Sequence, residues 1–508
     1  MFEKLKSLIR KVGVTIGLVS EIKSVEDHKD LVIDEKAYSR IKQNKSIYSG
    51  FFEDWHKLKY RNSNGDIKTR NMVTLNVAKV MAQRMASLIF NEKVIIDVTS
   101  RGKPPENEED KAHEFIKQTL KANGFHKNFQ RYYEYCMALG GMAIKVYEHN
   151  GKVKLAWASA DTFFPLSNDS DVIDEAVFIN EETKDGKYYT LLEWNEWEGN
   201  NYVVRNELYE SKDSKKLGVK IPLNTLYEGL DERTVIQGLS RPLFIYIKPN
   251  IANNKDLTSP LGISLYENSY DTLYFIDYLY DFFMNEFKLG KRRITVDPTM
   301  LKGIAKYDNR GQTVGFEKVF DTEETVFTPI GKADEGIKDL SVSLRSQDII
   351  DSINANLELL SMQAGLSPGT FTFDGKSVKT ATEVVSENSL TYQTKNSHGT
   401  LVEEGINELV TTILEVAYLC DIYDGDLEVD VSVDFDDSIA QDRNQNYRYY
   451  SSATIDGLMP KAEAIQRIFN VNEDTANEWL KIINQEKSRP MIRSEQVDML
   501  NLSPLNME

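Results

Sequence analysis

The residues closest to a chemical motif are Gly375, Lys376 and Ser377, which follow one another like the end of a phosphate-binding loop. That loop needs another glycine five residues earlier, after a buried strand, so that its backbone N–H groups cradle a phosphate. The required position holds Thr370, and the nearest glycine, Gly369, stands one residue too early. A helical pattern rather than a strand precedes the segment. We therefore interpret it as a loop with cationic tips.

A second candidate is an acidic strand at residues 428–436, where carboxylates alternate with apolar side chains. The alternation places Glu428, Asp430, Asp434 and Asp436 on one face. Such a cluster could hold Mg²⁺ for hydrolysis of nucleic acid. The same alternation is typical of a strand buried on one side, with its charged face in water. No histidine or lysine base is near, so the solvated strand is favoured and the Mg²⁺-dependent nucleic-acid enzyme is the alternative.

Dense aromatics mark residues 263–289, a stretch without proline that is predicted to form one long helix. At 1.5 Å per residue it would be about 40 Å long. Its apolar residues cover most of the circumference, which favours core or inter-subunit packing over a ligand site. The candidates for this packing are Tyr266, Tyr270, Tyr274, Phe283 and Phe287. The basic cluster Lys291, Arg292 and Arg293 follows, as favoured near a helix C-terminus.

Other metal-binding and catalytic motifs are missing from the sequence. The two cysteines, Cys136 and Cys420, are far apart, and none of the six histidines is three or four residues from another. These spacings fit neither a disulfide framework nor a local metal site. The motifs G-x-S-x-G, H-E-x-x-H, C-x-x-C and G-x-G-x-x-G are absent. We expect no cofactor, no metal and no enzymatic activity.

Composition and charge describe a folded, acidic chain. Its 508 residues are 41% apolar and 28% charged, enough for about three domains. The formal charge of −18 argues against a reader of DNA sequence, because such proteins are usually basic. Acidic copies in a ring would instead repel phosphates and let DNA slide through. We expect no membrane association, because no stretch approaches the roughly 18 apolar residues of a spanning helix.

The elements that must position these residues fall into an α+β, mainly helical order. Helical stripes dominate the first 142 residues, and alternating segments with turn signals such as Asn150-Gly151 then predict an antiparallel meander. Three long helices follow, and two short ones end the chain. The main predicted segments are helices 76–90, 108–123 and 129–137, strands 143–148, 152–157, 176–179, 188–194, 202–208 and 243–247, helices 263–289, 346–364 and 381–419, strands 293–296, 325–328 and 427–435, and helices 461–469 and 473–485.

In this order the parts resemble the portal protein family of tailed bacteriophages, especially siphophages of low-GC Gram-positive hosts. Three phrases carry the resemblance, which covers nearly the whole chain: residues 76–93, residues 365–369 leading to 380–384, and residues 431–438. The resemblance implies a dodecameric ring at one capsid vertex, with regions called wing, stem, clip and crown. The ring would be the conduit for DNA packaging and ejection.

The resemblance also assigns the regions of the chain. They are an N-terminal wing region at 1–262, stem helices at 263–289 and 346–365, a clip at 290–345, a tunnel loop at 366–380, a long wing helix and acidic strand at 381–439, and a crown with the C-terminal tail at 440–508. The tunnel loop would bring Lys376, Ser377 and Lys379 close to DNA, and the basic cluster would stand where the clip begins.

The partners implied by the resemblance are further copies of the chain, the terminase large subunit during packaging, and a head–tail adaptor protein afterwards. Major capsid and scaffolding proteins would surround the ring, and double-stranded DNA would pass through it without sequence recognition. The chain would be made and assembled in the host cytoplasm and remain in the virion. Another minor head protein is a further alternative.

Overall fold

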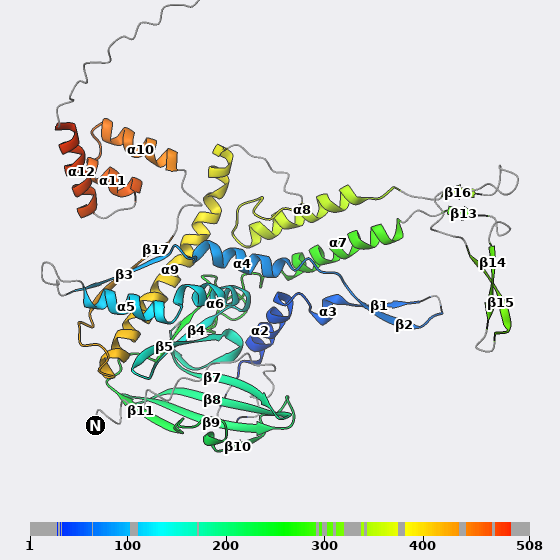
Figure 1. The fold of residues 1–508 in the computed structure, drawn as a ribbon, viewed down its shortest axis with the longest axis horizontal. Coiled ribbons are helices and arrows are strands. Elements are labelled where there is room, and N and C mark those ends of the chain that lie inside the picture. The colour runs from blue at the N-terminus through cyan, green and yellow to red at the C-terminus, as the bar shows by residue number, and fades with distance from the viewer. Residues whose placement is uncertain are drawn as a thin grey trace, which may run out of the picture. The chain divides into compact units, whose positions relative to one another are not determined.

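The computed structural model describes residues 28, 31, 33–62, 64–101, 110–169, 172–290, 294–296, 302–307, 311–319, 337–339, 343–373, 381–435, 443–469 and 473–488. Within these ranges the chain is an α+β protein (Figure 1). It divides into two compact units, Met1–Asp436 and Asp437–Glu508.

Capped helices open the first unit. They are α2 (Glu35–Tyr48), α3 (Glu53–His56), α4 (Val77–Ile89), α5 (Lys111–Ala122) and α6 (Phe125–Leu139). Asp34 and Asp110 each accept two N–H groups of the following helix, which satisfies donors that a helix start leaves unpaired. Gly140 ends α6 with a left-handed φ of 96°. The helices predicted from apolar stripes are confirmed, whereas α2 and α3 were not predicted.

A hairpin that the sequence reasoning missed lies between α3 and α4. Its strands are β1 (Lys57–Arg61) and β2 (Ile67–Asn71), paired antiparallel with Lys57 opposite Asn71 and Arg61 opposite Ile67. In the turn, Asn62 Oδ1 accepts the N–H groups of Asn64 and Asp66. The hairpin carries mostly polar residues, so it lacks the apolar alternation by which strands are recognised.

Two antiparallel sheets follow, where the sequence predicted one meander. The smaller has the order β12-β4-β5, and the larger β10-β9-β8-β7-β6 with β11 also paired to β9. Their strands are β4 (Met142–His149), β5 (Lys152–Ser159), β6 (Phe163–Asp169), β7 (Val172–Lys184), β8 (Lys187–Glu198), β9 (Asn201–Ser211), β10 (Val219–Ile221), β11 (Arg233–Gln237) and β12 (Phe244–Ile247). The single meander is wrong because β4 and β5 pair with the distant β12. The Asn150-Gly151 turn is confirmed, with φ of 54° and 73°.

A buried ion pair links the two sheets. The Lys145 ammonium of β4 lies 2.6 and 2.7 Å from the two carboxylate oxygens of Glu193 in β8. The side chains are 1% and 3% exposed, and Asn195 donates a further hydrogen bond to the same carboxylate at 3.2 Å. The pair thus stands among the aromatic and aliphatic residues that form the main core.

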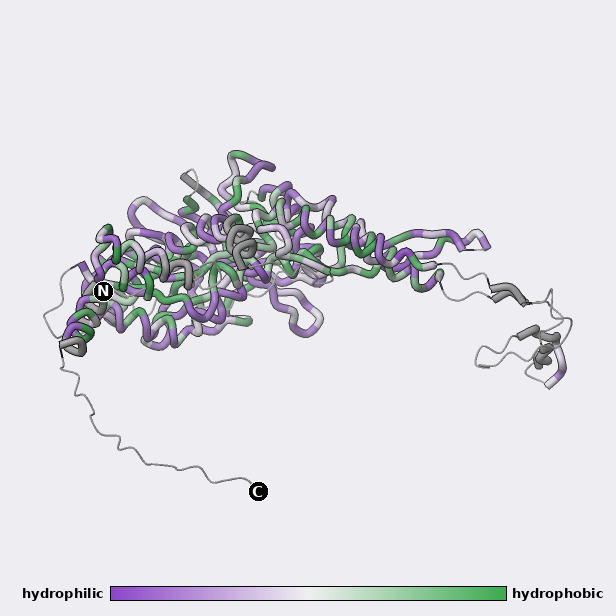
Figure 2. Tube along the Cα trace, turned by 90° about the horizontal axis from the view of Figure 1, so that it is seen from above, coloured by the Kyte–Doolittle hydropathy of each residue, from purple (hydrophilic) through white to green (hydrophobic). Residues whose placement is uncertain are grey.

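Three long helices complete the first unit: α7 (Tyr270–Leu289), α8 (Ser346–Gln363) and α9 (Ala381–Leu419). Hydrophobic stretches alternate with hydrophilic ones through this unit, as expected for elements that share a core (Figure 2). The predicted bounds of α9 are confirmed, and α8 ends one residue earlier than predicted. The prediction for α7 is wrong at its start, because residues 263–269 are not helical and contain a turn at 265–268. In them Leu265 N–H and Ser264 Oγ both donate to the Met137 carbonyl at the end of α6.

The segment between α7 and α8 contains short strands where the structure describes it. They form two antiparallel pairs, β13 (Ile294–Val296) with β16 (Ile337–Asp339) and β14 (Lys302–Tyr307) with β15 (Thr313–Val319). The predicted strand 325–328 lies outside the described residues. The last strand of the first unit, β17 (Val429–Asp434), pairs with β3 (Ile95–Ser100).

The second unit is helical where it is described. Its helices are α10 (Arg443–Ile455), α11 (Lys461–Phe469) and α12 (Glu473–Ser488). The two helices predicted there correspond to α11 and α12, and α10 was not predicted.

Candidate functional site

Two buried carboxylates on α7 fasten the preceding hairpin to this helix. Asp277 accepts the Leu75 N–H at 2.8 Å and lies 3.2 Å from Nε2 of His56. One turn later, Asp281 is held by both terminal nitrogens of Arg70 at 2.7 Å and by the Val73 N–H at 3.1 Å. The base of the hairpin, where β1 begins and β2 ends, is therefore attached to α7. The attachment points on α7 are the carboxylates of Asp277 and Asp281.

The charge state of Asp281 follows from these contacts. Burial alone would raise the pKa of its carboxyl, but the hydrogen bonds from Arg70 and Val73 outweigh burial and lower the pKa. The carboxylate is therefore ionised at neutral pH, and its double hydrogen bond with the Arg70 guanidinium is the strong, planar kind.

The aromatics of α7 divide between the core and the surface. Tyr266 precedes the helix, is completely buried and donates its hydroxyl to the Asn44 carbonyl at 3.0 Å. It therefore packs in the core of its own chain, which is one of the two kinds of packing expected for this aromatic segment. Tyr270 is partly buried and donates to Asn44 Oδ1 at 2.6 Å. Tyr274 and Phe287 are exposed, and the ring of Phe283 contacts that of Phe287.

Large apolar side chains are exposed on both α7 and α8. On α7 they are Tyr274, Phe275, Tyr278, Met284, Phe287 and Leu289, and on and beside α8 they are Leu344, Leu359 and Met362. Single exposed apolar residues are ordinary, whereas this many along two neighbouring helices form a surface of the kind that is common at protein–protein contacts.

A salt bridge joins α7 and α8 at the ends from which the segment 290–345 departs. Glu286 near the end of α7 accepts Nε and a terminal nitrogen of Arg345, which directly precedes α8, at 3.2 and 2.9 Å. The guanidinium also lies 5.2 Å from the ring centre of Phe282. The hydrogen bonds from Arg345 lower the pKa of Glu286. The basic cluster Lys291, Arg292 and Arg293 lies outside the described residues.

The beginning of the predicted tunnel loop is bound to both neighbouring long helices. Gly365 takes a left-handed φ of 68° after α8, and Thr394 of α9 donates to its carbonyl at 2.6 Å. Ser367 is buried and accepts from the Thr391 N–H through Oγ at 3.3 Å, while its own N–H donates to Thr391 Oγ1 at 2.9 Å. The first residues of the loop are thereby fixed to α9.

The next residues of this loop lean on α7 and α8. The Phe373 N–H donates to Asn354 Oδ1 of α8 at 2.8 Å. The Phe373 ring lies 6.3 and 6.1 Å from the ring centres of Tyr280 and Phe283 of α7. The candidates for DNA contact, Lys376, Ser377 and Lys379, lie outside the described residues. The fixed part of the loop therefore reaches at least to Phe373.

Comparison with known families decides what this arrangement belongs to. The sequence model described as "Phage portal protein, SPP1 Gp6-like" matches residues 27–489. The chain belongs to this phage portal family. It is thus a bacteriophage virion protein with a portal role in genome packaging. No curated protein matches the sequence.

The acidic strand of this portal protein is a solvated strand face where it is described. Asp430 is exposed and accepts from Nε of Arg101, on the chain after β3, at 3.0 Å. Within the described ranges, no three His, Cys, Asp or Glu side chains gather where a metal ion could bind. Asp436 lies outside these ranges. Likewise, no described helix has the length and apolar character needed to cross a bilayer.

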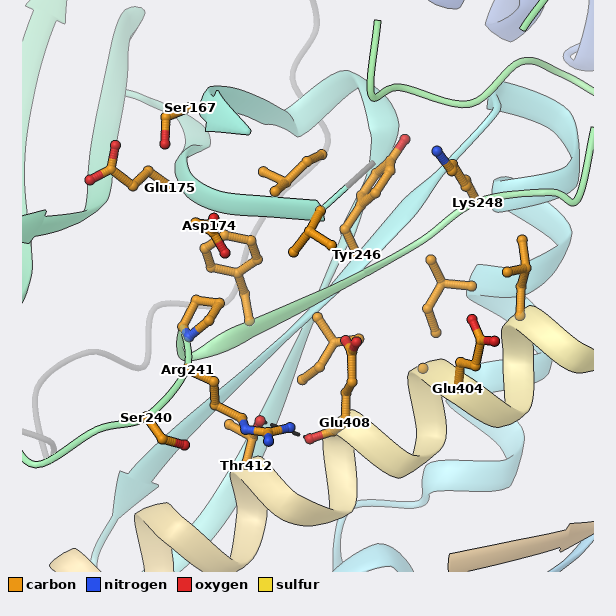
Figure 3. Close-up of a pocket in the computed structure, with 18 of the residues that line it drawn as sticks. Ser167, Asp174, Glu175, Ser240, Arg241, Tyr246, Lys248, Glu404, Glu408 and Thr412 are labelled. Carbon is orange, nitrogen blue, oxygen red and sulfur yellow. Dashed lines mark hydrogen bonds between the residues drawn. The ribbon is translucent and has the colours of Figure 1, made fainter. Parts of the chain in front are cut away.

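A pocket of the portal chain lies between β12 and α9 and has a volume of about 780 Å³ (Figure 3). Arg241, Glu404 and Glu408 line it together with Lys248 and Glu175. Burial raises the pKa of Glu408, the nearby Arg241 opposes this rise, and Glu404 adds to it. The pocket therefore holds charged side chains of both signs.

Sequence reasoning missed the attachment residues His56 and Arg70. Asp277 and Asp281 gave a signal, because two acids four residues apart in an aromatic helix need buried partners. Which partners they have could not be read from the sequence, since Arg70 stands 211 residues away from Asp281.

Proposed function

We propose that the chain forms a closed ring at one capsid vertex, through which double-stranded DNA enters during packaging and leaves during ejection. The uncovered apolar side chains of α7 and α8 carry this proposal, because one subunit leaves them in water and a neighbouring copy can bury them. The ring is taken to be a dodecamer. We take the ring to act as a structural conduit and not as an enzyme.

Within this ring, α7 and α8 form the stem, residues 290–345 the clip, and residues 440–508 the crown. The part of the tunnel loop after Phe373, with Lys376, Ser377 and Lys379, faces the DNA. Two lysines per subunit, repeated around a ring of acidic chains, give weak contacts with phosphates and no base readout. The DNA can therefore slide.

The clip is the docking site of the terminase large subunit and later of a head–tail adaptor protein. The basic cluster Lys291, Arg292 and Arg293 stands at its start and supports contact with an acidic partner surface. Major capsid and scaffolding proteins contact the outside of the ring at the vertex.

Purified protein tests the proposal. Light scattering gives the molar mass in solution, and negative-stain imaging reports the shape of the particles. We expect particles of many subunits with a central hole wide enough for a DNA duplex. A protein that stays monomeric at high concentration, or that assembles without a hole, would overturn the proposal.

A further inference from the structure

The hairpin β1–β2 is a cationic element in an acidic protein. Residues 57–71 contain five Lys or Arg and one Asp, whereas the whole chain has a formal charge of −18. Glu53 pairs with Lys57 and Asp281 with Arg70. Among the described residues, Lys59, Arg61 and Lys68 have no ion-pair partner. These three cations are thus available to an acidic surface of another molecule.

The register of the hairpin decides which side faces outward. Arg70 of β2 binds Asp281 of α7 and stands opposite Leu58 of β1 in the strand register. Arg70 and Leu58 are both partly buried, so the face of the hairpin that carries them turns towards α7. Side chains alternate along a strand, so Lys59 and Arg61 point the other way. Ile67, opposite Arg61, shares their face and is 66% exposed. The outer face thus combines two cations with an apolar side chain.

Helix α8 lies on the other side of α7. Glu286 of α7 binds Arg345, which precedes α8, so Glu286 lies on the side of α7 that faces α8. Asp277 and Asp281 bind the base of the hairpin, so they lie on the side of α7 that faces the hairpin. At about 100° per residue, Glu286 stands about 180° around the helix from Asp277 and about 140° from Asp281. Figure 1 shows the resulting order: α8, α7, then the hairpin. The two outer layers are opposite flanks of one subunit.

The exposed side of α8 complements the hairpin in charge and character. The helix contains Asp348, Asp351 and Glu358 and no Lys or Arg. These acids are exposed, and they share one stripe with the exposed Leu359 and Met362, opposite the buried Ile349, Ile353, Leu357 and Leu360. We call this surface the α8 stripe. From Asp348 to Met362 the stripe is about 21 Å long, against about 17 Å for β1, so it can cover the hairpin from end to end.

We propose that the α8 stripe of one subunit binds the outer face of the β1–β2 hairpin of the next subunit. A ring is built from one heterologous contact, in which a flank of each copy meets the opposite flank of its neighbour. The two flanks defined above satisfy that requirement with opposite charges. The carboxylates of the stripe pair with Lys59 and Arg61, and Leu359 and Met362 cover Ile67. The proposal rests on the ring of the proposed function.

A second copy fits the hairpin better than DNA does. Phosphates would pair with Lys59 and Arg61 but would leave Ile67, opposite Arg61, in water. The α8 stripe offers carboxylates and apolar side chains together, as the outer face requires. The hairpin is also attached to α7 by Arg70 and Asp281, so it is presented as a fixed surface.

Charge exchange across the contact is the test. The variants are Lys59→Glu/Arg61→Glu, Asp351→Lys/Glu358→Lys, and the combination of all four changes. Each reversal alone puts like charges in contact and should raise the concentration for half-assembly by about tenfold or more, measured by light scattering. The combination should restore assembly to near the wild-type concentration. Lys215→Glu/Lys216→Glu, at exposed lysines after β9, is the control for the same change in net charge and should assemble like wild type.

Cysteine cross-linking gives an independent measurement that does not depend on charge. The native Cys136 and Cys420 are buried, so they leave a low background. A chain carrying Ile67→Cys and Leu359→Cys should give, on oxidation, covalent multiples of the chain, whereas each single variant should give none.

The outcomes separate this contact from the ring itself. If wild-type rings form but neither restored assembly nor cross-links are observed, the contact is wrong and the ring stands. If the wild type forms no rings, the proposed function fails first. If Lys59→Glu/Arg61→Glu leaves the ring mass unchanged and only weakens retention on immobilised DNA, the hairpin is a DNA contact and the proposal is overturned.

Discussion

At the scale of single residues, the ion pair of Lys145 and Glu193 makes the sharpest prediction. Both side chains are almost fully buried between the two sheets. Lys145→Met leaves an uncompensated carboxylate in the core, so we expect it to lower the free energy of unfolding by about 3–5 kcal/mol. Chemical denaturation followed by circular dichroism measures the loss.

The matched control removes both charges. Lys145→Met/Glu193→Leu should regain most of the lost stability, because apolar side chains of similar size often replace a buried ion pair without cost. A double variant as unstable as the single one would mean that packing around Lys145, and not the isolated Glu193 charge, causes the loss.

Single residues also mark how far the sequence could lead towards the site. The exposed positions of Tyr274 and Phe287 agree with a packing role, which remains a prediction until assembly is measured. For Tyr266 the sequence could not choose between the core and a neighbouring copy, because its hydroxyl bonds to Asn44, a residue 222 positions away. Periodicity reports only that an aromatic belongs on some covered face, and not whether its own chain or a neighbour covers it.

At the scale of elements, the turn that ends α8 predicts an unequal effect of two similar substitutions. Gly365 and Gly151 both have left-handed φ, 68° and 73°. Alanine at either position should lower the free energy of unfolding by about 1–2 kcal/mol, because its Cβ disfavours the left-handed conformation. A Cβ at Gly365 would also stand 2.7 Å from Thr394 Oγ1, whereas at Gly151 it meets nothing within 4 Å. Gly365→Ala should therefore be more destabilising than Gly151→Ala in thermal unfolding, and equal effects would contradict the fixed loop start.

The attachment of the hairpin to α7 predicts a pH dependence. The pKa of Asp281 is lowered in the folded chain, so its stabilising contribution is complete above the unfolded value of about 3.9 and is lost as pH falls through the lower folded value. Asp281→Asn should cost about 1–2 kcal/mol at pH 7, since the Arg70 pair is partly exposed.

Urea denaturation of both proteins at pH 7 and near pH 3 tests this sign. The difference in free energy of unfolding between wild type and Asp281→Asn should shrink at the lower pH, because the wild-type carboxylate becomes protonated. A difference that stays constant or grows would mean that Asp281 acts through packing and not through its charge.

The elements differ in how well the sequence predicted them, and the reason is physical. Helices α8 and α9 were placed within a residue or two because long apolar stripes between glycine-containing turns are local signals. Strand pairing is not local, so the sequence could not reveal that β4 and β5 leave the meander to join β12. The β1–β2 hairpin was missed because its outer face is cationic and therefore lacks apolar alternation. The proposed subunit contact depends on this same cationic face.

At the scale of the whole molecule, charge sets two opposing effects on assembly. Subunits with a formal charge of −18 repel one another over long distances, while the hairpin and the α8 stripe attract at contact. The Debye length is about 30 Å at 0.01 M salt and about 8 Å at 0.15 M, so moderate salt screens the repulsion far more than contacts of about 4 Å. We therefore expect assembly to rise between these salt concentrations, measured as molar mass at fixed protein concentration.

Lys59→Glu/Arg61→Glu should assemble poorly across the whole range, because screening the net charge does not supply the missing contact. A wild-type mass that falls steadily from 0.01 M upwards would mean that contact attraction dominates even at low salt, and that the acidic net charge does not oppose the ring.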